Sequence, residues 1–202
     1  MDMMEKSPVF KEIIDEYLRQ VACRESREEI GRSLGIAVIE GGYRIPFFHR
    51  TYTIAVEGVT DENGKSATHA MSVILCKYIL MCPNRPSKDV SLITYKDFRD
   101  AAPYAGGFSD TANRPICERY SNNMNMLRER SLDLGGKIFP TEVACQLAMR
   151  FDALPKVPIV LLFHDADEDF PAQATILFQN NAASYLDMEC LAMIGGALAH
   201  YL

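Results

Sequence analysis

Tryptophan is absent from the sequence, and its six cysteines follow none of the spacings that hold a metal. There is no CxxC pair and no Cys-His pair at ligand spacing, so a zinc ribbon or a four-cysteine cluster is not expected. The opening residues, MDMMEK, are acidic and contain no apolar core segment. We therefore expect no secretory signal, a reducing cytoplasmic compartment and free thiols.

Long apolar runs and an excess of basic charge are also missing. The longest apolar run, residues 70–82, is interrupted by Lys77 and is shorter than the roughly 20 apolar residues that cross a bilayer. Lys and Arg number 21 against 27 Asp and Glu, which leaves a net charge of −6. A chain with this balance is not expected to bind a phosphate backbone. We therefore expect neither nucleic acid nor membrane as a partner.

Motifs for the commonest catalytic chemistries are missing as well. The chain has no G-x-S-x-G nucleophile turn, and it has neither G-x-G-x-x-G nor G-x-x-x-x-G-K-[ST] for nucleotide phosphates. From these absences we assign no catalytic residue, and the sequence indicates no particular cofactor.

The sequence does contain enough apolar residues for one sizeable core. Of its 202 residues, 48% are apolar and 24% are charged. A chain of this length buries roughly 70% of the surface that its unfolded form exposes. We predict a single α+β domain over residues 1–202. Its antiparallel or mixed sheet has about six or seven strands, covered by N-terminal, central and C-terminal helices.

Apolar spacing predicts three helices that belong to the core. Ser7-Pro8 is typical of a helix start, and the apolar stripe that follows it continues to Val21. Residues 67–81 are apolar on almost all sides, which indicates an internal helix. Residues 184–202 repeat apolar side chains at helical spacing and predict the third helix.

Two further helical features are less regular. The glycine pair Gly195-Gly196 lies inside the C-terminal helix and costs about 2 kcal/mol of helix propensity, so we expect close packing against a neighbour or a kink there. Residues 109–134 are polar and rich in arginine, with a sparse apolar stripe. They predict a helix that covers the surface of the sheet.

Short apolar runs between turn residues predict the strands. Two glycines suit a tight turn between the first two of these strands, and an eight-residue polar connection joins the last two as a hairpin. The predicted strands are residues 36–40, 43–48, 51–56, 90–95, 143–153, 157–163 and 172–178.

The connection of the last hairpin has the densest group of ionisable side chains. Four of the 27 acidic residues of the chain lie in it, directly after a histidine. Oxygen ligands at this density could hold Mg²⁺, Ca²⁺ or Mn²⁺, or tune one another for acid-base chemistry, although the glycine and final glutamate of a calcium loop are missing. The alternative is a solvated acidic turn. The candidate metal or acid-base residues are His164, Asp165, Asp167, Glu168 and Asp169.

A second candidate site is positively charged. Arg44, His49 and Arg50 flank the second and third predicted strands and could bind an anion through charge-assisted hydrogen bonds. Alternation along a strand favours the other interpretation, in which some of them are exposed charges on the outer face of a sheet.

Residues 154–195 resemble a prokaryotic family catalogued as domain of unknown function 3786. The family pattern there is a Leu-Pro-Arg start, a strand, an acidic turn into Glu-Phe-Pro, a strand that ends in Phe, and Tyr-Leu before an acidic helix start. The matching residues here are Leu154-Pro155-Lys156, Asp169-Phe170-Pro171, Phe178, Tyr185-Leu186 and Glu189. Earlier stretches at residues 43–54, 73–80 and 90–98 are also similar, so the resemblance covers most of the chain.

What the resemblance implies about function is modest, because the family has no assigned activity. Some relatives carry an added four-cysteine iron-sulfur module of the kind seen with corrinoid proteins, which implies anaerobic one-carbon metabolism. This chain lacks that module, so an iron-sulfur cluster would come from a partner.

Three hypotheses on function follow. The first is a non-catalytic binding or accessory protein that serves a corrinoid- or iron-sulfur-dependent pathway and binds a protein partner or a small-molecule cofactor. The second is a metal-dependent enzyme that uses the carboxylates of residues 164–169, with His164 as base or ligand. The third is a structural module that forms a homodimer through the C-terminal helix with its glycine pair.

Overall fold

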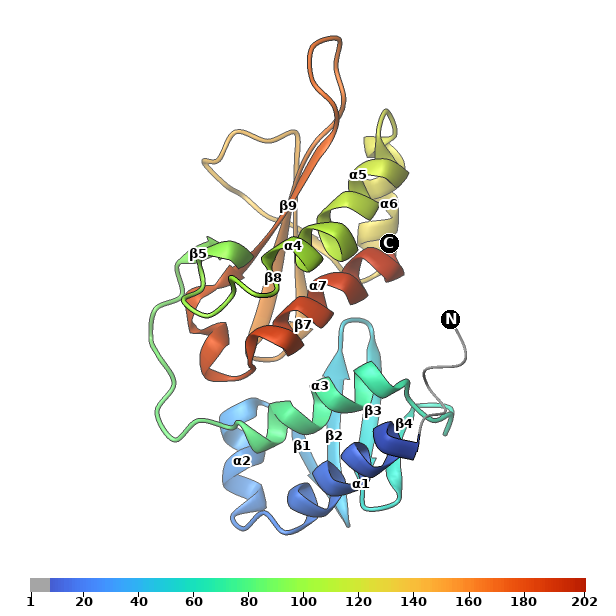
Figure 1. Ribbon diagram of the computed structural model, residues 1–202, viewed down its shortest axis with the longest axis vertical. Coiled ribbons are helices and arrows are strands. Elements are labelled where there is room, and N and C mark those ends of the chain that lie inside the picture. Colours follow the sequence, from blue (N-terminus) through green and yellow to red (C-terminus); the bar gives the residue numbers. More distant parts are fainter. Residues whose placement is uncertain (1–7) are drawn as a thin grey trace.

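The computed structural model describes residues 8–202, and the predicted cap Ser7 and the acidic start MDMMEK lie outside the described residues. The chain forms two antiparallel sheets with helices packed on them (Figure 1). The α+β class is therefore confirmed. The prediction of a single sheet is wrong, because the strands divide into a sheet of four and a sheet of five.

The four-stranded sheet has the order β1 (Ala37–Ile39), β2 (Gly42–Phe47), β3 (Arg50–Ala55) and β4 (Gly58–Asp61). Alternation along β2 buries Tyr43, Ile45 and Phe47 and leaves Arg44 and Pro46 exposed. The three strands predicted in this region are confirmed. Strand β4 escapes prediction because its sequence, Gly-Val-Thr-Asp, has one apolar side chain and no alternation to detect.

The five-stranded sheet has the order β5-β9-β8-β7-β6, with β5 (Leu92–Thr94), β6 (Lys137–Ile138), β7 (Leu147–Leu154), β8 (Val157–His164) and β9 (Gln173–Gln179). All of β8 except His164 is buried, so both faces of this central strand are covered. The predicted strands over 90–95 and 143–153 and the predicted hairpin are confirmed. The two-residue β6 is an addition.

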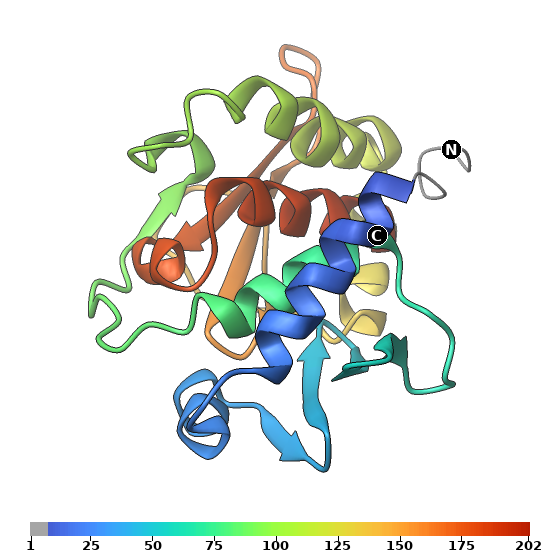
Figure 2. The ribbon, with the colours of Figure 1, turned by 60° about the horizontal axis from the view of Figure 1, so that its bottom comes forward.

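Helix α3 (His69–Leu80) is buried over almost its whole length. A helix with no polar face needs cover on every side. Helix α1 (Pro8–Ala22) packs along one side of α3, and α7 (Met188–Tyr201) packs along the other. Figure 2 shows these three helices side by side, with the four-stranded sheet below them. The predicted internal helix is thus confirmed.

One buried hydroxyl on α3 connects the segment before the four-stranded sheet to a turn of the five-stranded sheet. Tyr78 Oη donates to the carbonyl of Leu34 at 2.9 Å and accepts from the amide of Lys156 at 3.1 Å. Leu34 ends helix α2 (Arg27–Leu34), and Lys156 lies in the turn between β7 and β8. Burial raises the pKa of Tyr78, so the hydroxyl keeps the proton that it donates.

An ion pair beside this hydroxyl joins α3 to the start of α7. Lys77 Nζ lies 2.5 Å from Asp187 Oδ2, and Asp187 Oδ1 caps α7 by accepting from the amide of Cys190 at 2.9 Å. Burial alone would raise the pKa of Asp187, but the hydrogen bonds from Lys77 and Cys190 outweigh it and lower the pKa below its usual value. The carboxylate is therefore charged at neutral pH and holds both helices.

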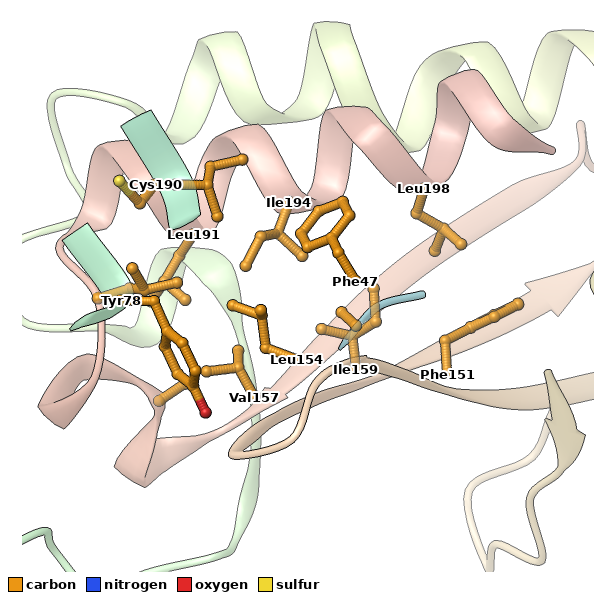
Figure 3. Close-up of a cluster of buried hydrophobic side chains, with 14 of the residues drawn as sticks. Phe47, Tyr78, Phe151, Leu154, Val157, Ile159, Cys190, Leu191, Ile194 and Leu198 are labelled. Carbon is orange, nitrogen blue, oxygen red and sulfur yellow. The ribbon is translucent and has the colours of Figure 1, made fainter. Parts of the chain in front are cut away.

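Helix α7 fills the inner face of the five-stranded sheet. Leu191, Ile194 and Leu198 of the helix point toward the strands, where Val157, Leu154 and Phe151 lie beneath them (Figure 3). Phe47 of the four-stranded sheet belongs to the same buried cluster. One continuous set of apolar contacts therefore includes residues of both sheets.

The middle of the chain forms several short helices: α4 (Ala105–Phe108), the π turn η2 (Ser109–Asn113), α5 (Arg114–Tyr120) and α6 (Met124–Asp133). The predicted stripe is confirmed, because Ile116, Tyr120 and Leu127 are buried. The prediction of one helix over 109–134 is wrong. The chain breaks after Tyr120, where Asn122 has a positive φ of 61° that no α-helix allows.

The glycine pair of α7 meets the π turn, as close packing requires. A Cβ atom on Gly195 would lie 2.4 Å from Cε2 of Phe108 and 3.2 Å from Cβ of Ala112. At Gly196 the nearest atom would be the carbonyl oxygen of Thr111 at 3.8 Å. The prediction of close packing is confirmed, and it is Gly195 that needs to be glycine.

We expect Gly195→Ala and Gly196→Ala to change stability in opposite directions. Alanine at 196 gains about 1 kcal/mol of helix propensity without a clash. Alanine at 195 must displace Phe108, which is held by stacking on Tyr95 at 4.3 Å, and should lower the free energy of unfolding by about 1–3 kcal/mol. Urea unfolding measures the stability of both variants. Equal free energies of unfolding would show that α7 and the π turn separate easily.

Candidate functional site

A groove of about 400 Å³ lies between α6 and the segment that leads from β6 into β7. Helix α6 contributes Met124, Asn125 and Arg128 to one wall, and residues 138–148 form the other. Its lining mixes apolar side chains with at least as much polar surface, and the groove is open to solvent. A concave site of this size could hold a small molecule.

The second wall is built by a segment that crosses the outer face of the five-stranded sheet. The amide of Phe139 donates to the carbonyl of Ala148 at 3.0 Å and continues the pairing of β6 with β7. Phe139 and Cys145 then pack on a small cluster of Ala148, Val160 and Leu162, which is separate from the main core. This segment therefore covers part of the sheet face opposite α7.

The lining of the groove combines apolar surface with one charge. Ile138 and Val143 are 57% and 54% exposed and line the groove with apolar surface. Arg128 is the one charged side chain among the lining residues, and the half-buried thiol of Cys145 lies in the same wall. The groove therefore suits a molecule with an apolar body and an anionic group.

Asp165 fixes the groove at its end near the acidic loop. Its carboxylate accepts from the amides of Asn122 at 2.5 Å and Met124 at 3.3 Å, and these amides lie at the start of α6. Its own amide donates to the side-chain oxygen of Gln146 at 2.6 Å. Asp165 thereby joins α6, the β7 segment and the β8–β9 hairpin, and the negative charge at the helix start is favourable.

The remaining candidates of the acidic loop lie on the hairpin tip, which extends away from the rest of the molecule (Figure 1). Asp167 Oδ1 accepts from the amides of Asp169 and Phe170, a turn closed within the loop. His164 and Glu168 are exposed. Within residues 8–202, no three His, Cys, Asp or Glu side chains lie where they could hold a metal ion together.

The basic candidates occupy the hairpin of β2 and β3. His49 and Arg50 are neighbours, with 3.4 Å between Arg50 Nε and His49 Nε2. Burial lowers the pKa of His49, and the charge of Arg50 adds to this effect. Arg44 pairs with Thr53 in the ladder, an odd number of residues from Arg50, so their side chains leave opposite faces of the sheet. The structure brings His49 and Arg50 together and keeps Arg44 apart.

Arg128, Phe139 and Cys145 are site residues that sequence reasoning misses. Arg128 comes from a helix, and Phe139 and Cys145 come from a segment whose apolar residues follow neither helical nor strand spacing. No local sequence pattern therefore connects the three residues. The one available signal is the placement of exposed Ile138 and Val143 in a stretch with no regular structure, which indicates an interaction surface.

Fold and groove together define an α+β protein with two antiparallel sheets and a concave site of ligand size. The chain belongs to the family described as Domain of unknown function (DUF3786), whose model matches residues 27–201. This confirms the resemblance found in the sequence. Neither the curated proteins nor the solved structures contain a match to the chain. Over residues 8–202, each helix is too short or too polar to span a bilayer.

We expect Asp165→Ala to lower the free energy of unfolding by about 1–2 kcal/mol, because the amides of Asn122 and Met124 lose their acceptor at the start of α6. Asp169→Ala is the matched control, since its carboxylate makes no hydrogen bond in the described chain. Urea unfolding measures both variants. Equal stability of the two would mean that the hydrogen bonds of Asp165 contribute nothing.

Proposed function

We propose that the protein is a non-catalytic binding or accessory protein, and that the groove beside α6 holds a small organic anion with an apolar body. The observation that supports this most is the groove itself, where apolar side chains such as Ile138 and Val143 line the same concave surface as Arg128. A ligand bound there would remove the exposed parts of these side chains from water.

The expected binding energy follows from the groove chemistry. Covering the exposed parts of Ile138 and Val143 removes apolar surface from water, at about 25 cal/mol per Å². A hydrogen bond from Arg128 to an anionic group adds about 1.5–3 kcal/mol. The cost of bringing two molecules together opposes these gains, so they indicate which groups contribute to binding and do not set the affinity. Asp165 contributes indirectly, by holding α6 and Gln146 in place around the groove.

The natural ligand that we propose comes from a cofactor-dependent anaerobic pathway, as the family resemblance implies. A whole corrinoid is larger than a groove of about 400 Å³, so the group that enters it would be an apolar and anionic part of such a cofactor, or of a protein partner that carries an iron-sulfur cluster. The proposal places the contact at Arg128 and the 138–148 segment.

The test uses 8-anilinonaphthalene-1-sulfonate, a fluorescent probe with an apolar body and one anionic group. We expect saturable binding to the native protein, and about tenfold weaker binding by Arg128→Gln, since a lost charge-assisted bond is worth about 1.4 kcal/mol or more. Arg130→Gln, an exposed neighbour on α6 outside the groove, should bind as the unaltered protein does. A parallel titration with cobalamin tests the corrinoid.

Two outcomes would contradict the proposal. One is the absence of saturable probe binding. The other is an equal effect of the two arginine substitutions, which would mean that the probe responds to surface charge and not to the groove.

The other two hypotheses have less support from the structure. In the acidic loop, Asp165 caps α6 and Asp167 closes its own turn, so neither carboxylate is directed at a shared ion. The glycine pair of α7 is covered by Phe108 and Thr111 of the same chain, and it does not offer a notch to a second copy.

A further inference from the structure

The five-stranded sheet has an open, uncharged edge at β5, on the side away from the groove beside α6 (Figure 1). Residues 90–94 read Val-Ser-Leu-Ile-Thr and contain neither proline nor a charged side chain. Val90 is 56% exposed and Leu92 is 36% exposed. Proteins normally protect such an edge with charge, proline, a bulge or a covering element, because its unpaired backbone groups can pair with another strand. The edge at β5 is therefore an interaction surface to account for.

The peptide groups of Val90 and Leu92 point away from the rest of the sheet. The carbonyls of Asp89 and Ser91 accept hydrogen bonds from the two amides that follow β9, at 2.9 and 2.8 Å. Hydrogen bonds to one neighbour involve every second residue of an antiparallel strand, so the intervening residues are directed to the other edge. Val90 and Leu92 therefore each present an N–H and a C=O group to solvent.

Asp97 limits how far this open edge extends. Its carboxylate accepts from the amide of Thr94 at 3.1 Å and from the hydroxyl of the same residue at 2.6 Å. The bond from the hydroxyl lowers the pKa of Asp97, so the carboxylate is charged at neutral pH. The amide of Thr94, which is directed to the same side as that of Leu92, is thus already paired. The free stretch is confined to Val90 and Leu92.

A second copy of the chain fits this stretch in one antiparallel register. When Ser91 of both copies lies on a twofold axis, Val90 of each copy lies opposite Leu92 of the other. Both are hydrogen-bonded positions, so each of these pairs exchanges its two N–H···O bonds. The side chains of Val90 and Leu92 leave the same face of the sheet and pack directly against their counterparts. The two five-stranded sheets become one continuous sheet.

Charge supports the same register. Lys88 is exposed and lies two residues before Val90. In the antiparallel pairing it lies opposite Thr94 of the second copy, next to the Asp97 carboxylate that caps Thr94. The twofold axis repeats this pairing of opposite charges on the other side, and the residues on the axis itself are uncharged serines. The edge is therefore complementary to itself in backbone, apolar contact and charge.

We propose that the protein forms a twofold dimer through the open edge of β5, with a second copy of the chain as the partner. The dimer goes beyond the proposed ligand binding and does not depend on it, because the groove lies at the opposite edge, beside β6 and β7. The paired stretch is short and the interface is small, so the dimer forms and dissociates with protein concentration.

Sedimentation velocity of the full chain, from low to high micromolar concentration, tests the dimer. We expect the dimer fraction to rise with concentration. Val90→Lys should raise the dissociation constant about tenfold, because the two apolar cross-strand pairs are lost. Val56→Lys is the matched control, since Val56 is also 56% exposed and lies in the turn between β3 and β4. It should associate as the unaltered protein does.

Leu92→Pro tests the backbone contribution. Proline removes the outward amide of Leu92 and leaves the pairing of Ile93 with Phe178 of β9 in place, as an edge strand allows. The variant should keep the circular dichroism spectrum of the unaltered protein and remain monomeric. If Leu92→Pro does not fold, Val90→Lys decides the question.

Ser91→Cys tests the register. On the twofold axis the two substituted residues have Cα atoms about 4.5 Å apart, which permits a disulfide. Oxidation with diamide should crosslink two copies of Ser91→Cys, whereas Ser87→Cys and the unaltered protein should stay uncrosslinked. A protein that is monomeric at every concentration, a dimer that Val90→Lys leaves intact, or crosslinking of Ser87→Cys in place of Ser91→Cys would overturn the proposal.

Discussion

The rest of the structure depends on the burial of α3, a helix with almost no polar face. Such a helix must be covered all round, and here α1 and α7 pack along its sides while the strands form two separate sheets. The hydroxyl of Tyr78 is a polar group buried in this contact. It is satisfied from both directions, by the carbonyl of Leu34 and the amide of Lys156. The ion pair of Lys77 and Asp187 stabilises the same contact at its partly exposed edge.

The groove of the proposed function lies at the periphery of the five-stranded sheet, away from this contact, and uses the outer face of the sheet. Asp165 supports this groove through its hydrogen bonds to the amides at the start of α6. On the inner face, Gly195 lets the π turn approach α7 closely. A rigid frame with a concave surface at its margin is an arrangement that suits ligand binding.

Local patterns in the sequence predict the individual elements well. The apolar period of residues 67–81, the hairpin of the last two long strands and the glycine pair of α7 all appear as expected. The division into two sheets is not predictable from them, because it depends on which strands pair in the folded chain. The groove is also not predictable from local patterns, because Arg128 and Cys145 come to line the same groove only in the folded chain. The composition of the acidic loop suggests a metal or acid-base site. In the structure, however, Asp165 accepts hydrogen bonds from the amides of Asn122 and Met124, which are far away in the sequence and which no local pattern indicates.

The central claim is that α3 makes the two sheets one cooperative unit, and hydrogen exchange on Tyr78→Phe tests it most directly. The substitution leaves the carbonyl of Leu34 and the amide of Lys156 without their partner, at a cost of about 1–3 kcal/mol. The account predicts that the slowest amides of β2 and β3 and those of β8 and β9 lose protection by the same factor, roughly tenfold, because both exchange through one global unfolding. Loss of protection in β2 and β3 alone, with β8 and β9 unchanged, would contradict it.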